Sequence, residues 1–103
     1  MKEVFAKITL LSAKEGGRKQ AIPLMSFGCP IYIENTPELA GHAYDCRLLV
    51  QEYGSPILPG ETVKKIKIVF LSPNEVIPLL KIGTRFTLWE GKTIAYGEII
   101  SIE

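Results

Sequence analysis

Histidine and cysteine are scarce in this chain of 103 residues, which has one histidine and two cysteines. Cys29 and Cys46 form no CxxC motif, and no histidine cluster lies beside them in the sequence. A structural zinc site needs four such ligands, usually in closely spaced pairs, so the composition argues against one. We therefore expect no metal and no cofactor, and we expect a reduced, cytoplasmic protein.

Long apolar runs are also missing. No stretch approaches the roughly 20 consecutive apolar residues that a membrane-spanning helix requires. The first residues, MKEVFAKITLLSAKE, contain a short apolar stretch that Lys7 interrupts, and no small-residue cleavage site follows it. This pattern is typical of a strand rather than a signal peptide. We expect no membrane partner.

A strong excess of charge is missing too, because the net charge is only +1. Such a balance gives no general electrostatic reason to bind nucleic acid or an anionic membrane. The charges are unevenly distributed, however. Residues 1–20 have five Lys and Arg against two Asp and Glu, residues 34–61 have one against five, and residues 64–92 have six against two. The folded surface is therefore expected to have a basic side and an acidic side.

The chain does have enough apolar sequence for one folded domain over residues 1–103. Hydrophobic residues make up 47% of it and charged residues only 22%, which favours a folded chain over a disordered one. A length of about 100 residues supports a single core but not two.

Apolar residues recur with a period of two rather than 3.6, which is the pattern of β-strands. Nine glycines and seven prolines punctuate the alternating segments and mark turns. PNEVIPLLKIG, at residues 73–83, has room for one short helical turn. About six short strands at this spacing predict an all-β barrel or sandwich. The predicted strands are residues 4–11, 30–34, 44–51, 64–71, 85–90 and 93–102.

The apolar residues of these strands should form most of the core. Each side chain that is fully buried contributes roughly 1.5–3 kcal/mol to folding. The expected core residues are Val4, Ile8, Leu10, Ile31, Ile33, Leu48, Val50, Ile66, Ile68, Phe70, Phe86, Leu88, Ile100 and Ile102.

EGKT, at residues 90–93, is similar to the end of a phosphate-binding loop. That motif also needs a glycine five positions before Gly91, where this chain has Phe86. It further needs a helix next, so that backbone N–H groups converge on the phosphate. The next residues, IAYGEIISI, alternate as a strand does. EGK is therefore predicted to be the turn of a C-terminal hairpin.

His42, the only histidine, is a candidate catalytic base. It could pair with Cys46 or Cys29 as the nucleophile and with Asp45 as the orienting carboxylate. The alternative is a surface histidine in a loop, and the chain has no nucleophile-elbow motif. We predict no catalytic residues and no enzymatic activity.

AKEGGRKQ, at residues 13–20, places two glycines beside charged residues. Gly16 and Gly17 permit a positive φ and the close approach of another chain. Arg18 and Lys19 supply donors for phosphate or carboxylate. The alternative interpretation is a solvated turn.

Four blocks of the sequence resemble, in order, the third domain of translation elongation factor Tu. ITLLSAKEGGRKQAIP, residues 8–23, resembles its first strand and LSK-EGGR loop. CPIYIENT resembles its proline-led aromatic strand, and LPGE, residues 58–61, resembles its MPGD turn. RFTLWEGKTIAYGEI is similar to its terminal RFAIREGGRTVGAGVV hairpin. The resemblance implies a small antiparallel β-barrel of about six strands.

The resemblance also implies a binding site. In the family, the opening loop and the terminal hairpin lie against the T-stem backbone of aminoacyl-tRNA, where a close-approach glycine and phosphate donors suit backbone recognition. The matching residues of this chain are Gly17, Arg18, Lys19, Glu90, Gly91 and Lys92.

The sequence departs from the family at several positions that would contact tRNA. The family's GYRPQF segment is SFGCPIY here, and its REGGR is WEGKT, with Trp89 in place of an arginine and Lys92 keeping one charge. The loop ENTPELAGHAY also differs from the Thr-rich form. Each lost phosphate contact removes a share of the counterion release that drives binding. We therefore expect weak tRNA binding.

The phosphate loop and guanine-reading motif of the factor are absent from this sequence, so no GTP binding is expected. The departures favour a free-standing copy of one domain over a fragment of an ordinary elongation factor. The preferred hypothesis is a domain mimic, a decoy or immunity-type module that binds a protein partner through a patch including Trp89 or Tyr96. The alternative is an accessory domain that contacts the T-stem backbone through Arg18, Lys19 and Lys92.

Overall fold

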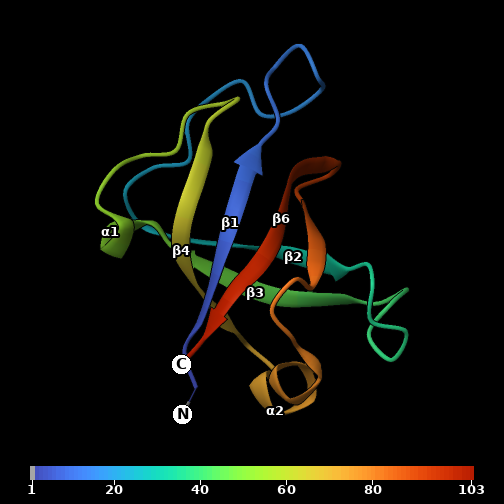
Figure 1. The fold of residues 1–103 in the computed structure, drawn as a ribbon. Coiled ribbons are helices and arrows are strands. Elements are labelled where there is room, and N and C mark those ends of the chain that lie inside the picture. Colours follow the sequence, from blue (N-terminus) through green and yellow to red (C-terminus); the bar gives the residue numbers. More distant parts are fainter. Residues whose placement is uncertain (1) are drawn as a thin grey trace.

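Six strands form a closed antiparallel barrel in the computed structural model, which describes residues 2–103 (Figure 1). The predicted domain of residues 1–103 includes Met1, which lies outside the described residues. The strand order around the barrel is β1-β4-β3-β2-β5-β6. The strands are β1 (Val4–Leu10), β2 (Ser26–Ile33), β3 (Ala43–Leu49), β4 (Thr62–Phe70), β5 (Arg85–Trp89) and β6 (Thr93–Ile102).

Short helical segments occupy two of the connections. Helix α1 (Val50–Tyr53) follows β3, and α2 (Pro73–Val76) with the 3-10 turn η1 (Ile77–Leu79) follows β4. In Figure 1, α2 and both chain ends lie at one end of the barrel, and the long β1–β2 connection lies at the other. The chain ends are held together there, because the Glu3 and Glu103 backbones exchange two hydrogen bonds of 2.7 and 2.8 Å.

The alternation of apolar residues correctly predicted every strand, and the all-β barrel is confirmed. One boundary differs clearly, because β2 begins at Ser26 rather than at Pro30. Strand β2 pairs with β3 from Ser26 onward but with β5 only from Ile31 onward. Pro30 therefore lies where one side of the strand has no partner, and a strand tolerates a residue without N–H at such a position.

The core contains twelve of the fourteen expected residues, and Ile100 was predicted wrongly. Phe5 pairs with Ser101 and Ala6 pairs with Ile99, so Ile100 is the extra residue of a β-bulge in β6. A bulge shifts the alternation by one position. Ile99 is therefore fully buried in place of Ile100, while Ile102 packs against the core and is only partly buried.

Loop residues extend the core at the ends of the barrel. Ile22 and Ile57 form an isolated antiparallel bridge with backbone hydrogen bonds of 2.9 and 3.0 Å, and both are buried. Leu39 and Leu80 are buried as well. These residues lie outside the alternating segments, so the pattern of apolar residues in the sequence could not identify them as buried. Among residues 2–103, the structure has no helix with the length and hydrophobicity needed to cross a membrane.

Candidate functional site

The loop after β1 is a compact turn built on Ser12 and Glu15. The Ser12 N–H donates to Glu15 Oε1 at 2.9 Å, and the Glu15 N–H donates to Ser12 Oγ at 3.2 Å. Such a reciprocal pair closes the first turn of a helix or tight loop. These hydrogen bonds hold the pKa of Glu15 below its ordinary value. Gly16, which follows, has a φ of 88°, a conformation that favours glycine.

Gly17 is packed against the chain's own backbone. Its N–H donates to the Ser12 carbonyl at 2.9 Å, and a Cβ built on Gly17 would lie 2.4 Å from the Leu11 carbonyl oxygen. The close approach expected at this glycine is therefore an approach by Leu11. Gly17 is buried and shapes the loop from within.

Arg18 joins this loop to the β5–β6 hairpin. Its Nη1 donates to both carboxylate oxygens of Glu90, at 2.6 and 2.7 Å. Its Nε and Nη2 donate to the carbonyls of Gln20 and Ala21 at 3.2 and 3.4 Å, and its guanidinium carbon lies 5.1 Å from the centre of the Phe27 ring. The Arg18 side chain is only 17% exposed. Every nitrogen of this guanidinium is thus engaged within the protein.

The segment EGK is the turn between β5 and β6, as predicted. Gly91 has a φ of 71°, and the Glu90 N–H donates to the Lys92 carbonyl at 2.8 Å. A strand follows rather than a helix. The backbone N–H groups of this turn therefore do not converge as they would in a phosphate-binding loop.

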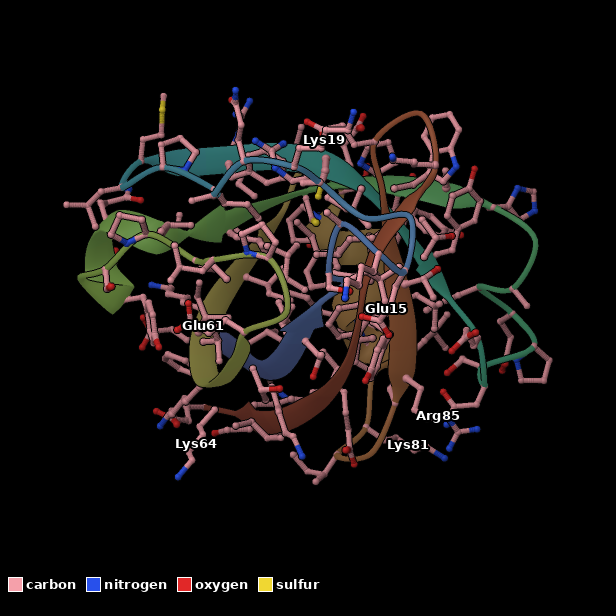
Figure 2. All side chains as sticks on the ribbon, turned by 90° about the horizontal axis from the view of Figure 1, so that it is seen from above. Glu15, Lys19, Glu61, Lys64, Lys81 and Arg85 are labelled. Carbon is pink, nitrogen blue, oxygen red and sulfur yellow. The ribbon has the colours of Figure 1, made fainter. Side chains whose placement is uncertain are left out.

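The structure brings the residues singled out by the resemblance together. Gly17, Arg18, Lys19, Glu90 and Lys92, with Gln20, line one shallow hollow of about 290 Å³. Gly91 lies in the adjoining turn and does not line it. Lys19, labelled in Figure 2, and Lys92 are exposed, whereas the Arg18 charge is compensated by Glu90. Lys19 and Lys92 are therefore the two cations of this hollow that form no ion pair among residues 2–103.

Beside this hollow, three aromatic side chains lie on the outer face of β2, β5 and β6. Tyr32 and Tyr96 both pair with Thr87 from opposite sides, and Trp89 follows on the same face of β5. Tyr32 is 36% exposed, Trp89 40% and Tyr96 53%. We refer to Tyr32, Trp89 and Tyr96 as the aromatic face. Trp89 and Tyr96 are therefore exposed, as the sequence analysis expected, and binding of a partner through them stays a prediction.

Charged residues form one edge of the aromatic face. Arg85 pairs with Glu98, and Glu98 pairs with Lys7, in the strand register of β5, β6 and β1. These three residues and Tyr96 line a mainly apolar hollow of about 210 Å³. Arg85 projects outward in the view from above (Figure 2). The outer surface of these strands therefore has aromatic residues bordered by charges of both signs.

Tyr32 is a surface residue that the sequence analysis did not single out. Its position between Ile31 and Ile33 places it on the outer face of a strand whose other face is buried. The alternation could have identified it. Its proximity to Tyr96 could not be predicted, because it depends on β5 lying between β2 and β6.

The structure does not assemble the alternative catalytic group. His42 is exposed, and its ring meets Tyr44 edge-on with 6.5 Å between the centroids. Cys46 is buried in the barrel, and its neighbour Asp45 faces outward. Within residues 2–103, no group of three or more His, Cys, Asp or Glu side chains is arranged to hold a metal ion.

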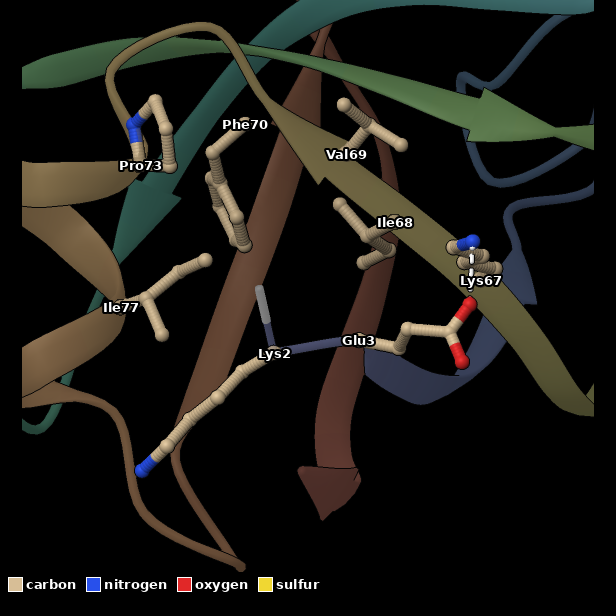
Figure 3. A pocket seen from close by; sticks show the side chains of 8 residues that line it. All are labelled: Lys2, Glu3, Lys67, Ile68, Val69, Phe70, Pro73 and Ile77. Atoms are coloured by element: carbon tan, nitrogen blue, oxygen red, sulfur yellow. Dashed lines mark hydrogen bonds and ion pairs between the residues drawn. The ribbon is translucent and has the colours of Figure 1, made fainter. Parts of the chain in front are cut away.

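A mainly apolar hollow of about 320 Å³ lies at the end of the barrel near the chain termini (Figure 3). Val69, Phe70 and Ile77 contribute to its walls. Lys67 Nζ and Glu3 Oε2 form an ion pair of 2.5 Å at its edge, which raises the pKa of Lys67. The hollow arises where the N-terminal residues meet β4 and α2, far from the resemblance-derived residues.

Comparison with known proteins does not identify a family or a function for this chain. No protein-family model matches the chain, and no curated protein is significantly similar to it in sequence.

Proposed function

We propose that this chain is a protein-binding module that mimics the third domain of translation elongation factor Tu. In this proposal it acts as a decoy or immunity-type protein. It occupies a toxin or regulator that would otherwise bind the factor. The module is non-catalytic, binds no GTP and operates in the cytoplasm.

Two features support the likeness on which this proposal depends. Four sequence blocks match the family domain in order, from the opening loop to the terminal hairpin. The chain also folds as a closed six-stranded antiparallel barrel, which is the architecture that the resemblance implies.

The aromatic face is the observation that carries the proposal. Tyrosine and tryptophan are enriched at the centres of protein interfaces, where they supply large contact area and a polar group at the rim. Because the sheet closes into a barrel, it has no edge strand along which a partner could add a full strand. Tyr32, Trp89 and Tyr96 instead offer side chains, and Arg85 and Glu98 supply the polar border.

The state of Arg18 favours a protein partner over the tRNA backbone. Phosphate recognition requires a guanidinium with free donors. Arg18 donates to Glu90, Gln20 and Ala21 instead, and a phosphate would have to displace the Glu90 carboxylate. This leaves Lys19 and Lys92 as phosphate donors.

The proposal predicts that the aromatic face determines partner binding. Truncating a central interface aromatic typically weakens binding by about 2 kcal/mol or more, a factor of about 30. We would immobilise wild-type chain and the Trp89→Ala and Tyr96→Ala variants, and capture proteins from a lysate of the source organism. The partner should be retained by the wild type and lost by both variants.

Tyr53→Ala is the matched control, because Tyr53 is also a half-exposed aromatic residue but lies on α1. It should retain the partner. Soluble elongation factor Tu, added in excess, should release the partner from the wild-type chain. A partner that both aromatic variants retain, or that the factor does not displace, would contradict the domain-mimic proposal.

Lys19 and Lys92, the exposed lysines of the hollow that Arg18 and Glu90 also line, support the alternative of an RNA-contacting accessory domain. Two phosphate contacts predict a fall in affinity of about tenfold between 50 and 200 mM salt. Titration with purified aminoacyl-tRNA at both salt concentrations measures this. Salt-sensitive binding that Lys19→Glu and Lys92→Glu abolish, and that Lys64→Glu on β4 leaves intact, would favour the alternative.

A further inference from the structure

Cys29 and Cys46 lie directly opposite one another inside the barrel. They are paired in the antiparallel register of β2 and β3, and both are free thiols. Directly opposed residues of antiparallel strands have Cα atoms about 4.5–5.5 Å apart. Disulfides form between Cα atoms about 4.4–6.8 Å apart, so the backbone already has a compatible separation.

The Cys46 side chain also reaches the backbone of Cys29. Both point into the core, and Cys46 Sγ donates a hydrogen bond of 3.4 Å to the Cys29 carbonyl oxygen. Cys46 pairs on its other side with Phe70 of β4, so apolar side chains surround the thiols. Once one of these thiols is oxidised, the other is the nearest nucleophile that can resolve it.

We propose that Cys29 and Cys46 form an oxidisable dithiol, which a hydroperoxide converts to an intrachain disulfide and a thiol reductant restores. This modification site does not depend on the proposed binding function. It involves the inner faces of β2 and β3, whereas the aromatic face lies on the outside of β2, β5 and β6.

The reaction proceeds in two balanced steps. The Cys29 thiolate attacks the hydroperoxide, the O–O bond breaks, and the departing oxygen takes up a proton to leave as an alcohol or water. The resulting sulfenic acid is then attacked by the Cys46 sulfur, which forms the S–S bond and releases water with the former thiol proton. In sum, two thiols lose two electrons and the hydroperoxide gains them.

The order of attack follows from exposure. Both residues are buried, but Cys29 is 6% exposed and Cys46 only 1%, so we assign Cys29 as the thiol that reacts first. A hydrogen bond with the Cys29 side chain, together with burial, raises the pKa of the Cys46 thiol. Cys46, the more deeply buried of the two, is therefore assigned as the resolving thiol.

The wild-type chain tests the proposal without any substitution. Purified full-length protein is treated with hydrogen peroxide under native conditions, and its thiols are counted after denaturation. We expect both thiols to disappear, the intact mass to fall by two hydrogen atoms, and no disulfide-linked dimer to form. The melting temperature should rise, because the disulfide closes a loop in the unfolded chain. Dithiothreitol should restore the two thiols, the original mass and the original melting temperature.

Two results would overturn the proposal. The first is the persistence of both thiols under conditions that oxidise a reference dithiol peptide. The second is disulfide-linked dimers as the main product, which would show that the thiols react between chains.

Single variants test the order of attack. Cys46→Ala should accumulate a sulfenic acid at Cys29, which a dimedone probe labels several times more strongly than it labels Cys29→Ala. Equal or inverted labelling would refute the assignment of Cys29 as the first thiol to react. Neither result bears on partner capture by the aromatic face, so the two proposals fail independently.

Discussion

The contact of Arg18 with Glu90 gives the most specific stability prediction. It joins the loop after β1 to the β5–β6 hairpin across 72 positions of sequence. Arg18→Ala removes the interaction with Glu90, two bonds to backbone carbonyls and the contact with the Phe27 ring. Glu90→Ala removes the ion pair alone. The two substitutions should therefore destabilise the protein unequally.

The magnitudes can be worked out contact by contact. Glu90 is 46% exposed, so solvent screens the ion pair and we assign it about 1 kcal/mol. The two long carbonyl bonds contribute about 1 kcal/mol together, and the contact with Phe27 about 0.5–1 kcal/mol. Arg18→Ala should therefore lower the free energy of unfolding by about 2.5–3 kcal/mol, and Glu90→Ala by about 1 kcal/mol.

A double-mutant cycle measured by urea denaturation isolates the pair. The interaction energy of Arg18 and Glu90 should be about 1 kcal/mol and should decrease at high salt. For a domain of this size, Arg18→Ala should also lower the melting temperature by roughly 10 °C or more. If Arg18→Ala costs no more than Glu90→Ala, or if the interaction energy is close to zero, Arg18 is free to bind phosphate.

Two further predictions concern Gly97 and Glu15. A Cβ at Gly97 would lie 2.5 Å from Cζ of Phe86, so Gly97→Ala should destabilise the protein by about 1–3 kcal/mol in urea denaturation. Gly28→Ala is its control, because the nearest atom there belongs to a flexible arginine side chain 3.3 Å away, and equal losses would contradict the packing argument. The pKa of Glu15 is lowered in the folded state by its hydrogen bonds with Ser12, so its contribution to stability is present above the ordinary value of 4.5 and is lost as the pH falls through the folded-state pKa. Thermal melts between pH 6 and about pH 3 should show this loss in the wild type and less of it in Glu15→Gln; identical pH profiles would exclude the contribution.

The alternation predicted the strands well because one face of each strand is buried, whereas the choice of a barrel over a sandwich came from the resemblance. Ile31 and Ile33 flank Tyr32, and this alternation reports the buried face directly. The bulge at Ile100 escaped prediction, because the two adjacent isoleucines, Ile99 and Ile100, offer no signal for which of them faces inward. Only the register with β1 decides that Ile99 is buried.

The candidate site was predictable in its composition but not in its electrostatics. The resemblance grouped the loop residues with the hairpin residues, and they line one hollow. Sequence gave no sign that Glu90 would compensate Arg18, because their pairing depends on the closure of the barrel. The opposition of Cys29 and Cys46 has the same origin, since alternation places each thiol inward but only the register places them face to face.

The most direct test of the central claim is capture on the immobilised chain at raised salt, with soluble elongation factor Tu as competitor. The domain-mimic account predicts a protein that is retained at raised salt, displaced by the factor, and not captured by Trp89→Ala. Recovery of tRNA alone, released by salt and unaffected by Trp89→Ala, would contradict it.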